Sequence, residues 1–179
     1  MRTADDERDG SLPQTPSGGA EPAPERASER SSERAPERLR AKASWLITHT
    51  ATPAGRLSAE AFAAIGARRY HYALLAALAE FGPASQAALG RRCGIDRSDV
   101  VAALNELVAA GQVVRSPDPA DRRRNVITLT PAGEDQLTRA DRVLAKAQDA
   151  LLAPLSGAER AELTRLLTLV LDHWTAEPS

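Results

Sequence analysis

The chain has 179 residues and a formal net charge of −1; 42% of its residues are hydrophobic and only 3% are aromatic. This hydrophobic fraction supports a folded core, and its richness in Ala and Leu favours packed helices over a β-sandwich. The near-zero charge excludes binding of polyanions over the whole surface, and the single Cys excludes a disulfide framework or a multi-cysteine metal site. No apolar run is long enough for a membrane span. We expect a soluble cytoplasmic protein of one folded domain and an appendage, without metal or cofactor.

The appendage is the N-terminal segment, residues 1–36, which contains Pro, Gly, Ser, Glu and Arg and almost nothing apolar. Such a segment buries too little surface to offset the entropy of ordering, and we interpret it as a disordered tail. Within it, Glu-Arg pairs recur every four residues from Glu25-Arg26 to Glu37-Arg38. A charged helical arm for DNA or a partner is one interpretation of this run, and a solvated tail with transient helix is the other.

Residues 37–66 have apolar positions at helical spacing, which predicts one or two amphipathic helices. Pro53 and Gly55 lie inside the pattern and predict a kink or short break, with Ser58 as the N-cap if the helix restarts. The next pattern predicts a helix whose apolar face includes Tyr70, Leu74, Leu75, Leu78 and Phe81.

The stretch from Ser85 to Thr130 predicts helix, turn, helix, strand, loop and strand. This is the order of a helix-turn-helix followed by a β-hairpin wing, in which the second helix enters the major groove of DNA. Ser85 is the expected cap of the first helix, Gly94 supplies the turn, and Asp96 is the expected cap of the second helix. The expected strands are residues 113–114 and 126–129.

The second helix of this motif has two different sides. Its expected apolar side consists of Val100, Val101, Leu104, Leu107 and Val108. Arg97, Ser98 and Asn105 then face outward, where side chains reach base edges and phosphates. Arg91 and Arg92, on the first helix, either touch phosphate or solvate their helix.

The loop between the expected strands is strongly basic, since Arg122, Arg123 and Arg124 follow one another. Because strands flank this triplet, we favour DNA contact at the wing tip over a merely solvated loop. Asp121 cannot attract DNA, and we expect it to pair with Arg115 or a wing arginine and to brace the hairpin. The predicted DNA-binding residues are Ser85, Arg97, Ser98, Asp99, Asn105, Arg122, Arg123 and Arg124.

The C-terminal part predicts two further helices. Thr130-Pro131 begins the first of them, with Thr as cap and Pro at the first helical position, and this helix runs to about Ala153. Ser156 and Glu159 have the spacing of a capping box that opens the last helix. The apolar stripe of that helix is wider than one small domain requires, so a second copy of the chain is the simplest partner. The stripe contains Leu163, Leu166, Leu167, Val170, Leu171 and Trp174.

Taken together, these residues resemble the MarR family of bacterial winged-helix regulators over about residues 38–175. The family's wing pattern, Asp-x-Arg followed by a strand closing in Leu-Thr, falls on Asp121, Arg123, Leu129 and Thr130. Its strand entry Gly-x-Val-x-Arg falls on Gly111, Val113 and Arg115, and its Leu-Ser-x-x-Glu helix opening falls on Leu155, Ser156 and Glu159.

The resemblance implies a mainly α fold with a small wing: a winged helix-turn-helix at residues 67–130 and dimerisation helices at residues 37–66 and 131–175. It implies a homodimer on a pseudo-palindromic operator in double-stranded DNA, acting mostly as a repressor that a small-molecule effector releases. Arg123, by its place in the motif, would enter the minor groove at the wing tip.

The family's ligand cleft lies between the dimer helices and the winged domain. By resemblance, the predicted ligand-binding residues are Trp45, His49, Arg56, His71 and Tyr72, although ordinary packing or surface roles also explain each of them. Thiol-sensing members exist, so Cys93 gives an alternative, redox-sensing regulator. Since Cys93 lies where an apolar side chain is expected in the turn after the first helix of the motif, we favour a structural role.

Two further function classes compete with a DNA-binding regulator. A winged-helix interaction module would use the wing to bind an acidic protein partner. An enzyme finds no support, because His49, His71 and His173 are widely separated and no Gly-rich phosphate loop is present. His173 is most simply a cation at the end of the last helix.

Overall fold

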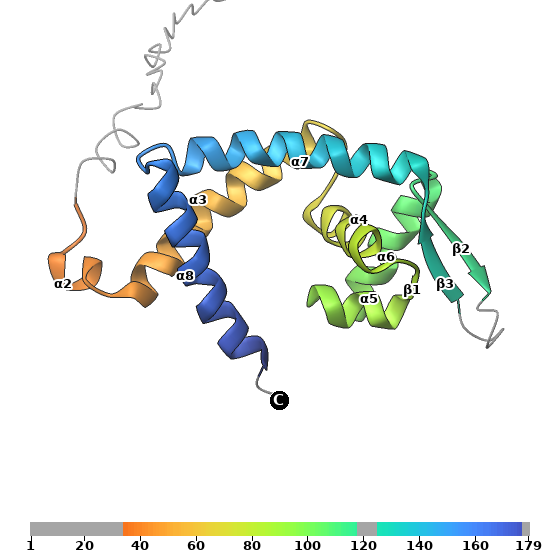
Figure 1. The fold of residues 1–179 in the computed structure, drawn as a ribbon, viewed down its shortest axis with the longest axis horizontal. Coiled ribbons are helices and arrows are strands. Elements are labelled where there is room, and N and C mark those ends of the chain that lie inside the picture. Colours follow the sequence, from red (N-terminus) through yellow and green to blue (C-terminus); the bar gives the residue numbers. More distant parts are fainter. Residues whose placement is uncertain (1–33, 118–124, 177–179) are drawn as a thin grey trace, which may run out of the picture. The chain divides into compact units, whose positions relative to one another are not determined.

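The computed structural model describes residues 34–117 and 125–176, which divide into two units with the boundary after Lys42. The described part of the first unit contains the short helix α2 (Glu37–Arg40), and every later element lies in the second unit. Figure 1 shows the elements in chain order, with the labels used below. Within the described residues, none of the helices combines the length and the apolar character needed to cross a membrane.

The helix-turn-helix and its wing share one apolar core. Three helices, α4 (Arg69–Phe81), α5 (Gln86–Cys93) and α6 (Arg97–Ala109), pack with the strands β2 (Val113–Pro117) and β3 (Asn125–Leu129) around it. Burial of a Leu or Val side chain contributes about 1.5–3 kcal/mol to folding. These helices and strands confirm the expected mainly α fold with a hairpin wing. The most completely buried side chains are Leu74, Leu75, Leu89, Leu104, Leu107, Ile127, Val100 and Val113.

The sheet contains a third strand that the sequence did not indicate. Strand β1 (Ala84–Ser85) pairs antiparallel with β3, so the sheet has the order β1-β3-β2. Ile127 on β3 lies opposite Ala84 on one side and opposite Arg115 on the other. The wing is thus joined directly to the residues that open α5.

Three predicted helix starts are confirmed by their hydrogen bonds. Ser85 Oγ accepts from the backbone N–H of Ala88 at 3.3 Å, and Thr130 Oγ1 accepts from that of Gly133 at 3.1 Å. At the start of the last helix, the Glu159 carboxylate accepts from the backbone N–H of Ser156 at 2.7 Å, which completes the capping box. Asp96 is the N-cap residue of α6, as expected, but its side chain makes no capping hydrogen bond.

Of the kink or short break predicted near Pro53, the break is wrong, because α3 (Ala43–Ala63) continues through this position. Ser58 lies inside this helix and donates from Oγ to the carbonyl oxygen of Ala54 at 2.8 Å, so it is no N-cap. A helix tolerates the hydrogen bond lost at an interior proline when packing compensates. Here α3 packs along α7 (Pro131–Leu151), with Phe62 and Ala140 buried between them.

Three expected core residues lie at the surface. Phe81 is 53% exposed, and the Arg92 guanidinium stacks over its ring with the carbon 4.0 Å from the ring centroid. Val101 and Val108 are also exposed, because α6 turns a narrower stripe toward α4 than the sequence pattern suggested. That buried stripe consists of Val100, Ala103, Leu104 and Leu107.

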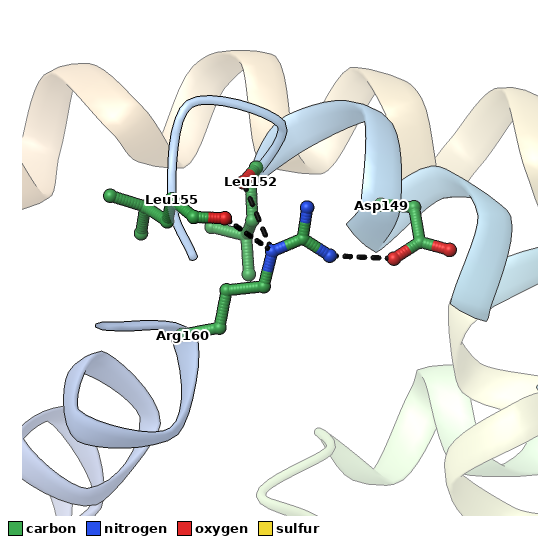
Figure 2. A network of polar contacts seen from close by, with 4 residues as sticks. All are labelled: Asp149, Leu152, Leu155 and Arg160. Atoms are coloured by element: carbon green, nitrogen blue, oxygen red, sulfur yellow. Dashed lines mark hydrogen bonds and ion pairs between the residues drawn. The ribbon is translucent and has the colours of Figure 1, made fainter. Parts of the chain in front are cut away.

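The turn between α7 and α8 (Gly157–Ala176) is held by Arg160, as Figure 2 shows. Its Nε donates to the carbonyl oxygens of Leu152 and Leu155 at 3.1 Å each, and its Nη1 lies 2.7 Å from Asp149 Oδ1. Carbonyl groups at a helix end have no partner within the helix, so the guanidinium satisfies them and fixes the start of α8.

Gly133, in the first turn of α7, lies directly against the end of the helix-turn-helix. A Cβ on Gly133 would be 2.2 Å from the carbonyl oxygen of Gln112 and 2.6 Å from Cδ1 of Leu129. The same junction is closed by Thr130, whose Oγ1 donates to the carbonyl oxygen of Gly111 at 2.7 Å. Only glycine permits this approach of α7 to the turn between α6 and β2.

We predict that Gly133→Ala destabilises the protein by about 1–3 kcal/mol through overpacking, even though Ala is the better helix former by about 1 kcal/mol. The free energy of unfolding in urea measures this effect. Gly157→Ala is the matched control, because nothing lies within 4 Å of its Cβ, and it should be neutral or stabilising. An equal effect of the two substitutions would contradict the close approach.

Candidate functional site

The outer side of α6 carries the predicted DNA-reading residues. Arg97, Ser98 and Asn105 are exposed on it, whereas Asp99 is half-buried. A groove of about 770 Å³ lies beside this side, and Ser85, Arg91 and Arg97 all line it. The fold thus brings the beginnings of α5 and α6 together at one surface, and this surface contains two arginines.

Arg115 links the wing to the outer side of α6. Its Nη2 donates to Oδ1 of Asn105 at 3.2 Å, so β2 is tied to the helix across its solvent side. This contact was not anticipated, because the sequence suggested Asp121 as the partner of either Arg115 or a wing arginine. Asp121 and the predicted wing-tip residues Arg122, Arg123 and Arg124 lie outside the described residues.

The five residues predicted to bind a ligand are not brought together. On α3, Arg56 and His49 are exposed and Trp45 is half-buried, and the Trp45 and His49 rings stack on each other with centroids 3.8 Å apart. His71 is buried, and its Nε2 donates to the Glu106 carboxylate at 2.8 Å. Of the five, only Tyr72 lines the crevice described next.

A crevice of about 740 Å³ lies among α3, α7 and the start of α4. Apolar side chains form much of its wall, among them Phe62 and Leu144, while Arg68 and Arg69 bring positive charge to it. We call it the effector crevice, after the role proposed for it below. The two arginines were missed, since the only signal for them is an adjacent pair immediately before a helix.

Tyr72 is held in place at the wall of the effector crevice. Its hydroxyl donates to Oδ1 of Asp141 at 2.8 Å, and its ring stacks on Phe62 with centroids 5.4 Å apart. Burial raises the pKa of Tyr72 above its ordinary value, and the hydrogen bond to Asp141 and the charge of that carboxylate add to the effect. The phenol therefore stays protonated at neutral pH and acts as a donor.

Cys93 lies half-buried against the helix-turn-helix core, with its Sγ 3.5 Å from the carbonyl oxygen of Ala73. Burial raises the pKa of its thiol, and the nearby charge of Arg92 offsets this only in part. A reactive thiol requires a lowered pKa, so the surroundings of Cys93 fit the packing role. In residues 34–117 and 125–176, no three His, Cys, Asp or Glu side chains are grouped closely enough to hold a metal ion.

Three known proteins that this chain resembles are all named as regulators of transcription. Residues 67–124 match the sequence model of the MarR family. A protein of Thauera aromatica assigned to regulation of the hcr operon is 36% identical over 96 residues, which cover 54% of this chain and 58% of that protein. The repressor NicR of Pseudomonas putida is 30% identical over 101 residues, which cover 56% of this chain and 64% of NicR. The chain thus matches less than two thirds of either curated relative.

The solved structure of the PcaV transcriptional regulator from Streptomyces coelicolor, in complex with its natural ligand, has the same fold. It superposes with a TM-score of 0.62 at 26% identity, over 75% of this chain and 94% of PcaV. All three proteins are named as regulators of transcription and none as an enzyme.

We predict that Cys93 in the folded protein reacts with iodoacetamide several-fold more slowly at pH 7.5 than in the chain unfolded in urea. Since burial raises the pKa of the thiol, less thiolate is present at this pH, and the rise of the rate should shift to higher pH. Mass spectrometry of alkylated protein follows the reaction. A faster rate in the folded protein would favour the redox-sensing alternative.

Proposed function

We propose that this chain is a MarR-type, ligand-responsive regulator of transcription that acts as a repressor, because residues 67–124 match the sequence model of that family. It binds a pseudo-palindromic site in double-stranded DNA as a homodimer, and a small organic molecule releases it. The alternative of a protein-interaction module is kept as an outcome of the DNA-binding experiment below.

The observation that carries this proposal is the division of α6 into two sides. One side is buried in the core, and the other presents Arg97, Ser98 and Asn105 to solvent. The major groove admits an α-helix, and an Arg in it pairs with guanine through two hydrogen bonds, while Ser bonds to bases or phosphates. A helix whose position is set by buried Leu and Val residues can present these groups without reorganising.

The wing adds contacts that do not depend on base identity. By the family motif, Arg123 enters the minor groove, where a narrow groove concentrates negative potential. Its neighbours Arg122 and Arg124, also outside the described residues, would lie close to phosphates. Arg91, which lines the groove beside α6, is the corresponding phosphate contact on the helix-turn-helix.

The C-terminal helix supports the homodimer. In α8 the apolar residues are exposed, although solvent exposure of so many large side chains on one helix is unfavourable. A second copy of the chain covers them, and its two-fold axis would set the two recognition helices about 34–36 Å apart on DNA. The exposed residues are Leu166, Leu167, Leu169, Val170, Leu171 and Trp174.

The effector crevice supports release by an organic anion. Its wall combines Phe62 and Leu144 with two cationic residues, Arg68 and Arg69, which suits a small molecule with an apolar body and a carboxylate. PcaV, which has the same fold, was solved with its natural ligand bound.

The DNA-binding claim is tested by selecting duplexes from a random library and measuring their affinity by fluorescence anisotropy. We predict that a selected pseudo-palindrome binds about 10³-fold or more tightly than random duplex at physiological salt. Arg97→Ala should cost about 1–3 kcal/mol of this discrimination. Arg142→Ala, which removes the same charge from an exposed position on α7, is the control and should leave the preference unchanged. Equal affinity for selected and random duplex would support the interaction module.

The same duplex tests the wing. Arg123→Ala should abolish tight binding, while size-exclusion chromatography still shows a dimer. Loss of the dimer would mean that Arg123 does not belong to the wing.

The dimer claim is tested on α8. Leu171 is 62% exposed, so Leu171→Asp should leave the fold intact but bury a charge in the dimer interface, giving a monomer with weakened DNA binding. Light scattering coupled to size exclusion measures the mass. The control is Thr168→Asp, on the polar side of the same helix, which should remain a dimer. A dimeric Leu171→Asp variant would place the interface elsewhere.

A further inference from the structure

Glu106 lies on the side of α6 that faces α4, away from Arg97, Ser98 and Asn105. Both of its carboxylate oxygens are engaged there: Oε1 forms an ion pair with Arg68, and Oε2 accepts from His71 Nε2 at 2.8 Å. Arg68 immediately precedes α4 and His71 lies in its first turn, so one acidic side chain ties α6 to the beginning of α4.

The two partners of Glu106 differ in their access to solvent. His71 is buried, with 8% of its surface exposed, and it bonds Glu106 inside the protein. The Arg68 side chain is 69% exposed, and the same residue lines the effector crevice. Arg68 therefore belongs both to the crevice and to the ion pair that reaches the recognition helix.

We infer that an organic anion in the effector crevice acts on the recognition helix by competing with Glu106 for Arg68. A carboxylate that takes the guanidinium leaves Glu106 with His71 as its partner, and α6 loses its ion pair to the start of α4. A ligand shifts an equilibrium only through its different affinity for two states. The anion favours the state in which Arg68 is free of Glu106, and DNA favours the state in which α6 is tied to α4. This inference rests on the proposed function for the DNA-bound state only.

The competition predicts two separate effects of one substitution. Glu106→Gln removes the charge that competes for Arg68 but retains an oxygen that accepts from His71. The variant should therefore bind the anion more tightly without DNA. Its DNA affinity should no longer respond to the anion, because Arg68 is free in both states. Coupling between two sites is reciprocal and usually amounts to about 5–150-fold.

The test uses the full chain with benzoate, an aromatic carboxylate, and the selected duplex. Calorimetry without DNA should give at least about fivefold tighter benzoate binding for Glu106→Gln than for the unaltered chain. Benzoate should weaken DNA binding of the unaltered chain at least about fivefold and that of Glu106→Gln hardly at all. Glu80→Gln, which removes the same charge at the exposed end of α4, is the matched control and should behave as the unaltered chain.

A second variant protects the test against misfolding. Arg68→Gln changes an exposed side chain and should abolish benzoate binding. Unchanged benzoate affinity in Glu106→Gln, persistent coupling in it, or benzoate binding that survives Arg68→Gln would each overturn the inference, as would no benzoate binding to the unaltered chain. If DNA is not bound selectively at all, the proposed function fails, but the benzoate affinities measured without DNA still decide whether Glu106 and the anion compete.

Discussion

The buried side of α6 is the constraint on which the rest of the structure depends. Val100, Leu104 and Leu107 are each at most 1% exposed, so the rotation of this helix about its axis is set by the core. The outer side is then determined as well, and it presents Arg97, Ser98 and Asn105. The C-terminal end of the helix is held too, by the ion pair of Glu106 with Arg68 and by the close approach of Gly133 to Gln112, which follows the helix.

These two contacts connect α6 to the elements that surround the effector crevice. Gly133 belongs to α7, which also forms part of the crevice wall and packs along α3. Arg68 immediately precedes α4 and lines the same crevice. A molecule bound there would therefore lie against Arg68 and against Leu144 on α7.

The order of the helices and strands and the starts of several helices could be predicted from the sequence, because they depend on residues close together in the chain. The caps at Ser85 and Thr130 depend on hydrogen bonds spanning three residues, so the side chain and its spacing identify them. Strand β1 could not be predicted, since two residues show no alternation and pair only with a strand about forty positions later in the chain. The ion pair of Arg68 with Glu106 could not be predicted either, since it joins residues far apart in the chain that meet only through tertiary packing. His71 was predicted as a ligand-binding residue, but it lies buried against Glu106, and the sequence did not indicate this pairing.

The central claim is that two copies of α6 occupy successive major grooves on one face of DNA. Hydroxyl-radical footprinting of the selected duplex tests this most directly. The account predicts two protected segments related by a two-fold axis, with centres about 10–10.5 base pairs apart. A single protected segment, or uniform weak protection along the whole duplex, would contradict it.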